Sequence, residues 1–304
     1  MKISLPRPLS KTIVNLHKRH DVFKCIHQSH THFEHRVSVY HVIKEKKCYP
    51  EGCIYFNWKC RLLNKGTTCP KKYKHVGRNC FNCKEFYDEK EIFKPELLLN
   101  KDDYQKFQRE LIGYEDWLDE LKDKEVEFAG TISSVKPSFR NKEYHRKNQL
   151  SIDGFLINFK GGFINLDYFD DFVYAKVSSR MQHRYKFCMG DKLNFYARIR
   201  ELRGRILLFK LHRIDIEEKA DNEIWTESKA HLANKTGTII PMQYDRCLNC
   251  DKGSLVDTSA DPTKQRMLLC LEGIKDPHHC TYTLSKLLLM DRCAKEGKKR
   301  DGSI

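Results

Sequence analysis

The chain has 304 residues, of which 40% are hydrophobic, and its formal net charge is +15. This hydrophobic share is enough for packed cores, which excludes a wholly disordered chain, and no apolar run approaches the ~18 residues of a membrane-spanning helix. The basic N-terminus lacks a continuous apolar stretch and does not resemble a secretory signal. We therefore expect a cytoplasmic protein with no membrane partner.

The positive charge is concentrated toward the N-terminus. Residues 1–84 carry 18 Lys or Arg and four Asp or Glu, whereas residues 85–124 carry seven and 13. Solubility alone does not require such segregation. The pattern predicts a polyanionic partner, with nucleic acid ahead of an acidic protein or a lipid surface.

Residues 1–90 are predicted to form a basic, Cys/His-rich metal-binding module. Clustered cysteines in a chain that is not exported bind metal more often than they form disulfides. Six thiolates exceed one mononuclear zinc site, which leaves open a second site, two unligated thiols or a cluster. The predicted ligands are Cys48, Cys53, Cys60, Cys69, Cys80 and Cys83, the last two in a C-x2-C turn.

A stretch just upstream offers further ligands for a second site. Imidazole nitrogens bind zinc readily, so at least one histidine here is expected to be a ligand, although ordinary polar surface explains any single one of them. The stretch "CIHQSHTHFEH" contributes Cys25, His27, His30, His32 and His35. Zinc is the favoured metal, and the alternative is a [4Fe–4S] cluster at the N-terminal cysteines, because Cys-only ligation and aromatic neighbours also suit iron.

The interval between Cys69 and Cys80 is densely basic. Ligation of the flanking thiols would fix this loop and present its cations together, and phosphate contacts of this kind make affinity dependent on salt. The predicted nucleic-acid contacts in the loop are Lys71, Lys72, Lys74 and Arg78.

Residues 91–124 are predicted to form an acidic helical connector. Asn100 is suited to cap the helix, and Asp103 falls near its positive first turn. Packing against the rest of the chain is favoured over a dimeric coiled coil, because three heptads are barely covered. Apolar residues recur at intervals of three and four in one narrow stripe, made of Tyr104, Phe107, Leu111, Tyr114, Leu118 and Leu121.

Residues 125–219 change to strand periodicity and predict a small β-barrel. The segments "VEFAGTISSV", "FVYAKVS", "KLNFYARIR" and "RILLFKLHRIDI" read as strands, with "ELRG" as a turn before the last. In the third segment Leu193, Phe195, Ala197 and Ile199 share the face expected to be buried. The opposite faces of the second and third segments carry the expected nucleic-acid contacts Tyr174, Lys176, Tyr196, Arg198 and Arg200.

The barrel segments resemble OB-fold proteins. "GTISSV" resembles a first strand, and "GDKLNFYARIRELRGRILLFKLHRIDI", with Gly-Asp before an alternating strand and a hairpin, resembles the closing strands. "QLSIDGFLINFKGGFINLDYF" would supply the middle strands, with a turn or bulge at residues 161–162. Over about 90 residues the resemblance implies an OB-like barrel with a nucleic-acid ligand.

Residues 236–291 are predicted to form a zinc-ribbon-like element, followed by a basic tail at 292–304. A C-x2-C turn points two thiolates at one ion, and two thiolates from a distant segment complete a tetrahedron. The element departs from zinc ribbons because its second pair is not C-x2-C, so His278 and His279 are alternative ligands. The predicted ligands are Cys247, Cys250, Cys270 and Cys280.

Taken together, these segments predict an α+β multidomain protein that binds single-stranded DNA or RNA and holds two zinc ions. An enzyme is not expected and no catalytic residue is named, because the P-loop, G-x-S-x-G, H-E-x-x-H and zinc-deaminase patterns are missing from the sequence. Two alternatives remain: an iron–sulfur protein in electron transfer or in the service of a redox enzyme, and a zinc-stabilised adaptor that binds protein.

Overall fold

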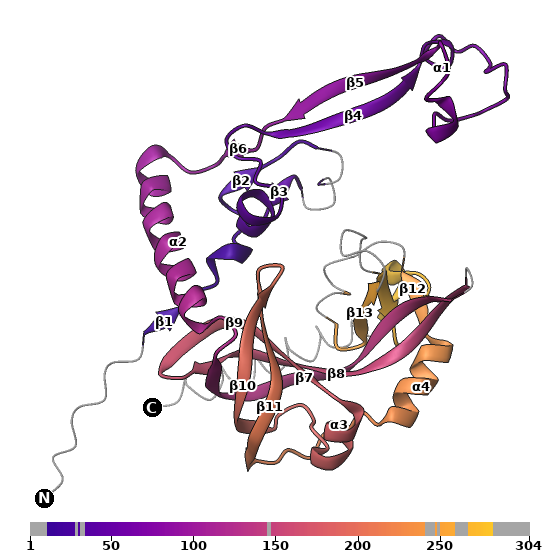
Figure 1. Cartoon of the computed structure of the whole chain (residues 1–304). Coiled ribbons are helices and arrows are strands. Elements are labelled where there is room, and N and C mark those ends of the chain that lie inside the picture. The colour runs from indigo at the N-terminus through magenta and orange to yellow at the C-terminus, as the bar shows by residue number, and fades with distance from the viewer. Residues whose placement is uncertain are drawn as a thin grey trace, which may run out of the picture. The chain divides into compact units, whose positions relative to one another are not determined.

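The computed structural model describes residues 11–27, 30, 34–144, 147–240, 247, 250–258 and 267–281, so the predicted tail at 292–304 lies outside it. The chain is of mixed α and β structure and divides into two compact units, whose elements are labelled in Figure 1. The barrel unit comprises Met1–Val14, Leu121–Glu201 and Ile206–Ile304, and the hairpin unit comprises Asn15–Glu120 with Leu202–Arg205. Within the described ranges, no helix has both the length and the hydropathy to cross a membrane.

Strands dominate both units. The described strands of the barrel unit are β1 (Thr12–Ile13), β7 (Glu125–Tyr144), β8 (Lys147–Ile164), β9 (Asp167–Val177), β10 (Lys192–Leu202), β11 (Arg205–Glu218), β12 (Thr238–Ile240), β13 (Gly253–Thr258) and β14 (Met267–Cys270). Its helices are α3 (Ser179–Tyr185), α4 (Glu227–Thr236) and the 3-10 turn η5 (Pro277–His279). The hairpin unit contains β2 (Phe23–Lys24), β3 (Arg36–Val37), β4 (Cys53–Cys60), β5 (Phe86–Phe93), β6 (Glu96–Leu97), α1 (Arg61–Asn64), α2 (Lys101–Leu121), the 3-10 turns η1 (Leu16–Lys18) and η4 (Arg78–Cys80), and the π-helical turn η3 (His41–Glu45).

Five strands close a barrel in the order β7-β8-β9-β11-β10, with β10 returning to β7. The pairs β7–β8, β8–β9 and β10–β7 are antiparallel, whereas β9 and β11 run parallel. Phe195 of β10 lies opposite Phe128 of β7, and both are fully buried. The prediction of a small barrel is therefore confirmed, as is the inward face of β10, where Leu193, Phe195, Ala197 and Ile199 are all buried.

The glycine pair at 161–162 forms the expected irregularity in β8. The register with β9 shifts between Lys160 and Gly162, and Gly161 has a φ of +81°, a conformation that favours glycine. A Cβ at Gly162 would lie 2.6 Å from the ring of Phe128. The bulge therefore bends the strand where the barrel core leaves no room for a side chain.

The Gly-Asp pair before β10 joins three segments of the barrel unit. Gly190 has a φ of +92°, and its N–H donates to the carbonyl of Ile132 at 2.8 Å. The fully buried Asp191 carboxylate accepts hydrogen bonds from the N–H of Cys188 and of Ala220, each at 2.9 Å, and from Lys219 Nζ at 2.7 Å. Burial alone would raise the pKa of Asp191, but these donors hold it below its ordinary value.

Replacing Asp191 by Asn should lower the free energy of unfolding at neutral pH by on the order of 3 kcal/mol, because Lys219 and two amides lose a charged acceptor. The folded-state pKa lies below the unfolded value of about 3.9, so this stabilisation is present above that value and is lost as pH falls through the folded pKa. The unfolding free energies of wild type and variant, measured in urea, should therefore converge as the pH falls below about 3.9. A difference that does not change with pH would contradict a role for the charge, and the exposed Asp215→Asn is the control.

Three short strands extend the same sheet beyond the barrel. The antiparallel pairs β12–β14 and β13–β14 form a three-stranded ribbon, and β13 joins the far part of β7 in parallel, Val256 opposite Phe139. These two residues share a buried cluster with Ala233, Leu269 and Leu271. The strands of the C-terminal element are therefore packed against β7 of the barrel.

Helix α2 confirms the predicted cap and most of the predicted stripe. Asn100 Oδ1 accepts a hydrogen bond from the Asp103 N–H at 2.8 Å. The stripe prediction missed Trp117, which is buried and stacks on Tyr114 with ring centroids 6.1 Å apart, while Leu118 is only half-buried. The helix falls almost entirely within the compact unit that also contains residues 15–100.

The β4–β5 hairpin is the longest feature of the hairpin unit. Its ladder runs without a break from Cys53 opposite Phe93 to Cys60 opposite Phe86. Figure 1 shows it projecting from the short strands β2, β3 and β6, with α1 and the following loop at its far end. An isolated two-stranded ribbon is marginal in water, so this hairpin needs support at its ends.

Candidate metal centres and nucleic-acid interface

Cysteines gather in distinct parts of the two units. Across the described ranges, no set of three or more His, Cys, Asp or Glu side chains converges closely enough to hold an ion as the side chains stand. Two pockets nevertheless bring together most of the predicted ligands. Each unit contains one of these pockets.

The pocket of the barrel unit is lined by all four cysteines of the predicted C-terminal site, Cys247, Cys250, Cys270 and Cys280. The Lys252 N–H lies 3.4 Å from Cys250 Sγ, an amide-to-sulfur contact of the kind that stabilises a thiolate. The alternative ligand His278 is exposed and does not line the pocket, and the side chain of His279 lies outside the described residues. The sequence therefore identified a set of thiols that the fold brings together.

A lysine that the sequence did not single out lies beside this pocket. Lys136 of β7 is buried, and its Nζ donates to the carbonyls of Cys250 at 2.5 Å and Gly253 at 3.1 Å. Burial raises the pKa of Cys250, and the Asp251 carboxylate and then the Cys280 thiol add to this effect, whereas the Lys252 amide and the Lys136 charge oppose it. Strand alternation alone predicts that Lys136 lies on the outer face of β7. The sequence did not reveal its burial, because the covering segment lies more than 110 residues away in the chain.

Gly253 shapes the C-x2-C turn. Its N–H donates to the Cys250 carbonyl at 3.1 Å, and a Cβ at this position would collide with the carbonyl oxygen of Cys247. No larger residue fits unless the turn opens and moves the two thiols apart.

Gly253→Ala should therefore destabilise the barrel unit by about 1–3 kcal/mol. Thermal unfolding of the variant and of wild type measures the loss. Gly113→Ala is the matched control, because its Cβ meets no atom within 4 Å and Ala suits a helix better than Gly. Unchanged unfolding in the Gly253 variant would show that the turn tolerates a wider form.

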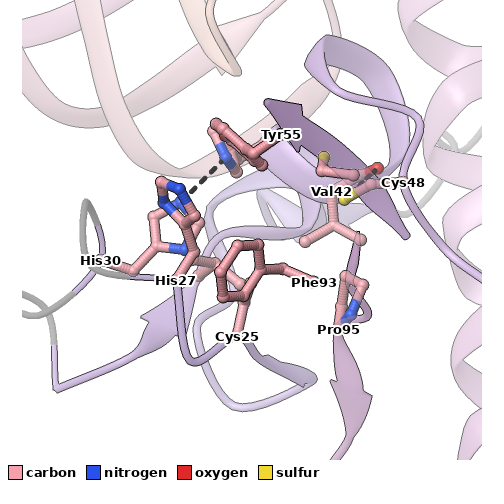
Figure 2. Close-up of a pocket in the computed structure, with 11 residues that line it drawn as sticks. Cys25, His27, His30, Val42, Cys48, Tyr55, Phe93 and Pro95 are labelled. Carbon is pink, nitrogen blue, oxygen red and sulfur yellow. Dashed lines mark hydrogen bonds between the residues drawn. The ribbon is translucent and has the colours of Figure 1, made fainter. Parts of the chain in front are cut away.

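The pocket of the hairpin unit combines cysteines and histidines from separate stretches of sequence (Figure 2). Cys25, His27 and His30 from the upstream stretch meet Cys48 and Cys53 there, whereas Cys60, Cys69, Cys80 and Cys83 are not among its lining residues. His35 bonds the Cys25 carbonyl at 3.1 Å through Nδ1, and His32 lies outside the described residues. The predicted N-terminal ligands are thus not gathered at one point.

The imidazoles of this pocket have different partners. His27 stacks on Tyr55 with ring centroids 4.0 Å apart. His30 Nε2 lies 3.2 Å from His41 Nε2, and His41 Nδ1 lies 2.9 Å from Glu45 Oε2. His41 was missed from the sequence, although its spacing of four from Glu45 on a helical turn is a usable signal.

Burial shifts the pKa values of two side chains in this pocket, His30 and Cys48. Burial, and then the neighbouring His41, lowers the pKa of His30 to about 4. Burial, and then the Cys53 thiol, raises the pKa of Cys48 to about 12. Both groups are therefore neutral at physiological pH, because burial outweighs the single backbone hydrogen bond that favours the charged form of each.

Four cysteines remain at the far end of the hairpin. Cys60 ends β4 and is buried, and its ladder partner Phe86 donates its N–H to the Cys83 carbonyl at 3.0 Å. Cys80 and Cys83 form a turn closed by a 2.8 Å bond between the Cys83 N–H and the Cys80 carbonyl. The cations predicted in the intervening loop, Lys71, Lys72, Lys74 and Arg78, are all exposed.

The barrel residues predicted to bind nucleic acid belong to two patches. Tyr174 and Lys176 lie on β9 and the other three on β10, and β11 runs between these strands. On β10 and its neighbour, the Arg213 guanidinium lies 5.7 Å from the Tyr196 ring centroid, and that of Arg200 lies 4.6 Å from Phe209. Arg198 and Arg200 are exposed.

The β8–β9 patch contains residues that the sequence did not single out. Phe172 lies next to Tyr174 on the same face, with ring centroids 6.4 Å apart, and Lys160 of β8 is opposite Phe172. Lys176 is bonded to Asp153 at 2.6 Å, which partly neutralises it. The alternation of "FVYAKV" puts Phe172 on the same face as Tyr174, but the sequence prediction named only Tyr174 and Lys176 on this strand.

No protein-family model, curated protein or solved structure matches this chain.

Proposed function

We propose that this chain is a metal-stabilised protein that binds single-stranded nucleic acid on the outer face of β8 and β9. The strand order β7-β8-β9-β11-β10, the parallel pair β9–β11 and the position of α3 between β9 and β10 are those of an OB-fold and support that resemblance. OB-folds bind oligonucleotides across their second and third strands, which here are β8 and β9.

The observation that carries the proposal is the aromatic pair on β9. Phe172 and Tyr174 are half-buried on the outer face, so each ring has an accessible portion. A base stacked on such a ring contributes about 1–3 kcal/mol, and the neighbouring Lys160 and Lys176 supply cations for the phosphates. Stacking does not depend on base identity, so we expect weak sequence preference.

The remaining basic residues extend the same chemistry. Tyr196, with Arg198 and Arg200, forms a second patch on β10. In the hairpin unit the exposed loop cations contact phosphates and contribute affinity without reading sequence.

Zinc is the metal that the C-terminal pocket fits best. Four thiols line it, an amide contacts one sulfur, and a three-stranded antiparallel sheet supports the turn, as in zinc ribbons. Bound there, Zn²⁺ would be held by Cys247, Cys250, Cys270 and Cys280. A brown protein absorbing near 400 nm would instead indicate the iron–sulfur alternative.

Tyr174→Ala should weaken binding of a fluorescein-labelled single-stranded oligonucleotide by about 5- to 100-fold, because one stacking platform is removed. Tyr174→Phe keeps the ring and should bind like wild type, which makes it the matched control. Fluorescence anisotropy at fixed salt measures both. Equal affinity in wild type, Tyr174→Ala and Phe172→Ala would contradict the assignment of this face.

Changing Lys71, Lys72, Lys74 and Arg78 together to Gln should lower the slope of log affinity against log salt by roughly 3, at about 0.7 per lost phosphate contact on a single strand. A salt titration of the same anisotropy assay measures the slope. The control changes Lys101, Lys106, Lys122 and Lys124, all exposed, which alters net charge equally. Identical slopes in the two variants would indicate that the salt dependence follows the net charge of the chain and does not come from this loop.

A further inference from the structure

We propose that the six clustered cysteines of the hairpin unit serve two separate metal ions, one of them bound at the base of the β4–β5 hairpin by Cys25, Cys48, Cys53 and His30. The other ion belongs to the far end of the hairpin, with Cys60, Cys69, Cys80 and Cys83. Together with the C-terminal pocket this gives three ions per chain. This assignment of metal ligands, and the metal analysis that tests it, do not require the chain to bind nucleic acid.

The length of β4 separates the two sets. Cys53 and Cys60 are its first and last residues, and the ladder between them is unbroken. Seven steps of ~3.3 Å place them about 23 Å apart. Zinc–sulfur bonds are about 2.3 Å long, so no single ion or small cluster reaches both ends.

Counting ligands then assigns the sites. The far end retains four cysteines, a complete tetrahedral set. The base retains only Cys48 and Cys53, but its pocket also contains Cys25 and imidazole nitrogens. A set of three cysteines and one histidine completes the second tetrahedron without borrowing from the first.

The hydrogen bonds of the pocket select His30 as the fourth ligand. The Glu45 carboxylate can only accept, so His41 donates to it through Nδ1–H and presents an unprotonated Nε2. His30 then donates to that nitrogen through its own Nε2–H, which leaves a lone pair on Nδ1. His30 Nδ1 is buried and has no hydrogen-bond partner in the described structure. In zinc sites the other ring N–H of a ligating histidine commonly donates to a second group, which fixes the tautomer and orientation of the ring. Here His41 would be that group for His30, and Glu45 would orient His41.

The four groups line one pocket without converging on a point (Figure 2). An ion bonded to all of them would draw them together and release the thiol protons, because the thiolate is the form that binds. It would also tie the loop after β2, the segment after η3 and the first residue of β4 to one centre. Such an anchor explains how a two-stranded ribbon is supported at its base.

Metal content of the full chain, measured by elemental analysis after purification in zinc, tests the assignment. We expect three zinc ions per chain in wild type, two in Cys25→Ser and in His30→Ala, and two in Cys83→Ser. The double variant Cys25→Ser with Cys83→Ser should hold one. Cys188→Ser, a buried thiol outside every set, should retain three and is the control.

His30→Cys separates a ligand from a merely structural residue. It should restore three ions, and in the cobalt-substituted protein it should increase sulfur-to-metal charge-transfer absorption, because ligation by three sulfurs and one nitrogen becomes ligation by four sulfurs. His41→Phe should retain three ions with weaker affinity at one site. Three ions in both Cys25→Ser and His30→Ala would overturn the base site. A double variant that loses no more than either single variant would overturn the division into two sites, and a His30→Cys chain that stays at two ions would overturn His30 as a ligand.

Discussion

The parallel pairing of β9 with β11 is the contact on which the barrel unit depends. The pairs β7–β8 and β8–β9 join strands that follow one another in the chain, whereas β9 and β11 pair only after a crossover through α3 and β10, and β10 must also return to β7 to complete the ring. Closure removes the free edges of a strongly apolar sheet. The buried Asp191 lies within this crossover and accepts from the N–H of Cys188 and of Ala220, so one carboxylate ties the start of β10 to the segment that follows β11.

The hairpin unit has a much smaller apolar core than the barrel unit. Its strands β2, β3 and β6 are each two residues long, and apolar side chains such as Ile54 and Phe56 of β4 stay more than half exposed. Little apolar area is therefore available to fix the ribbon. Small units with such cores usually rely on ligation or cross-links, which fits the concentration of thiols and imidazoles at both ends of the hairpin.

The sequence predicted what depends on local periodicity. Alternation predicted the inward residues of β10, the Asn before the helix predicted its cap, and the glycine pair at 161–162 predicted a turn or bulge, because each depends on neighbours in the chain. It did not reveal that β11 separates Tyr174 from Tyr196, since strand order is decided by non-local pairing. Spacing likewise grouped six cysteines that an extended ladder holds apart, and it could not show that Cys25 lies with Cys48.

One consequence of the unbroken β4–β5 ladder concerns reach. Because every residue of β4 is paired with β5, the strands set the distance of the charged loop from the base, and the base sets the direction in which the loop is presented. If the base loosened, the loop would keep its own shape, but its charges would be spread over a larger volume. Their effective concentration near a polyanion bound elsewhere on the chain would then fall. Orientation of the arm, more than the chemistry of its tip, would then limit avidity.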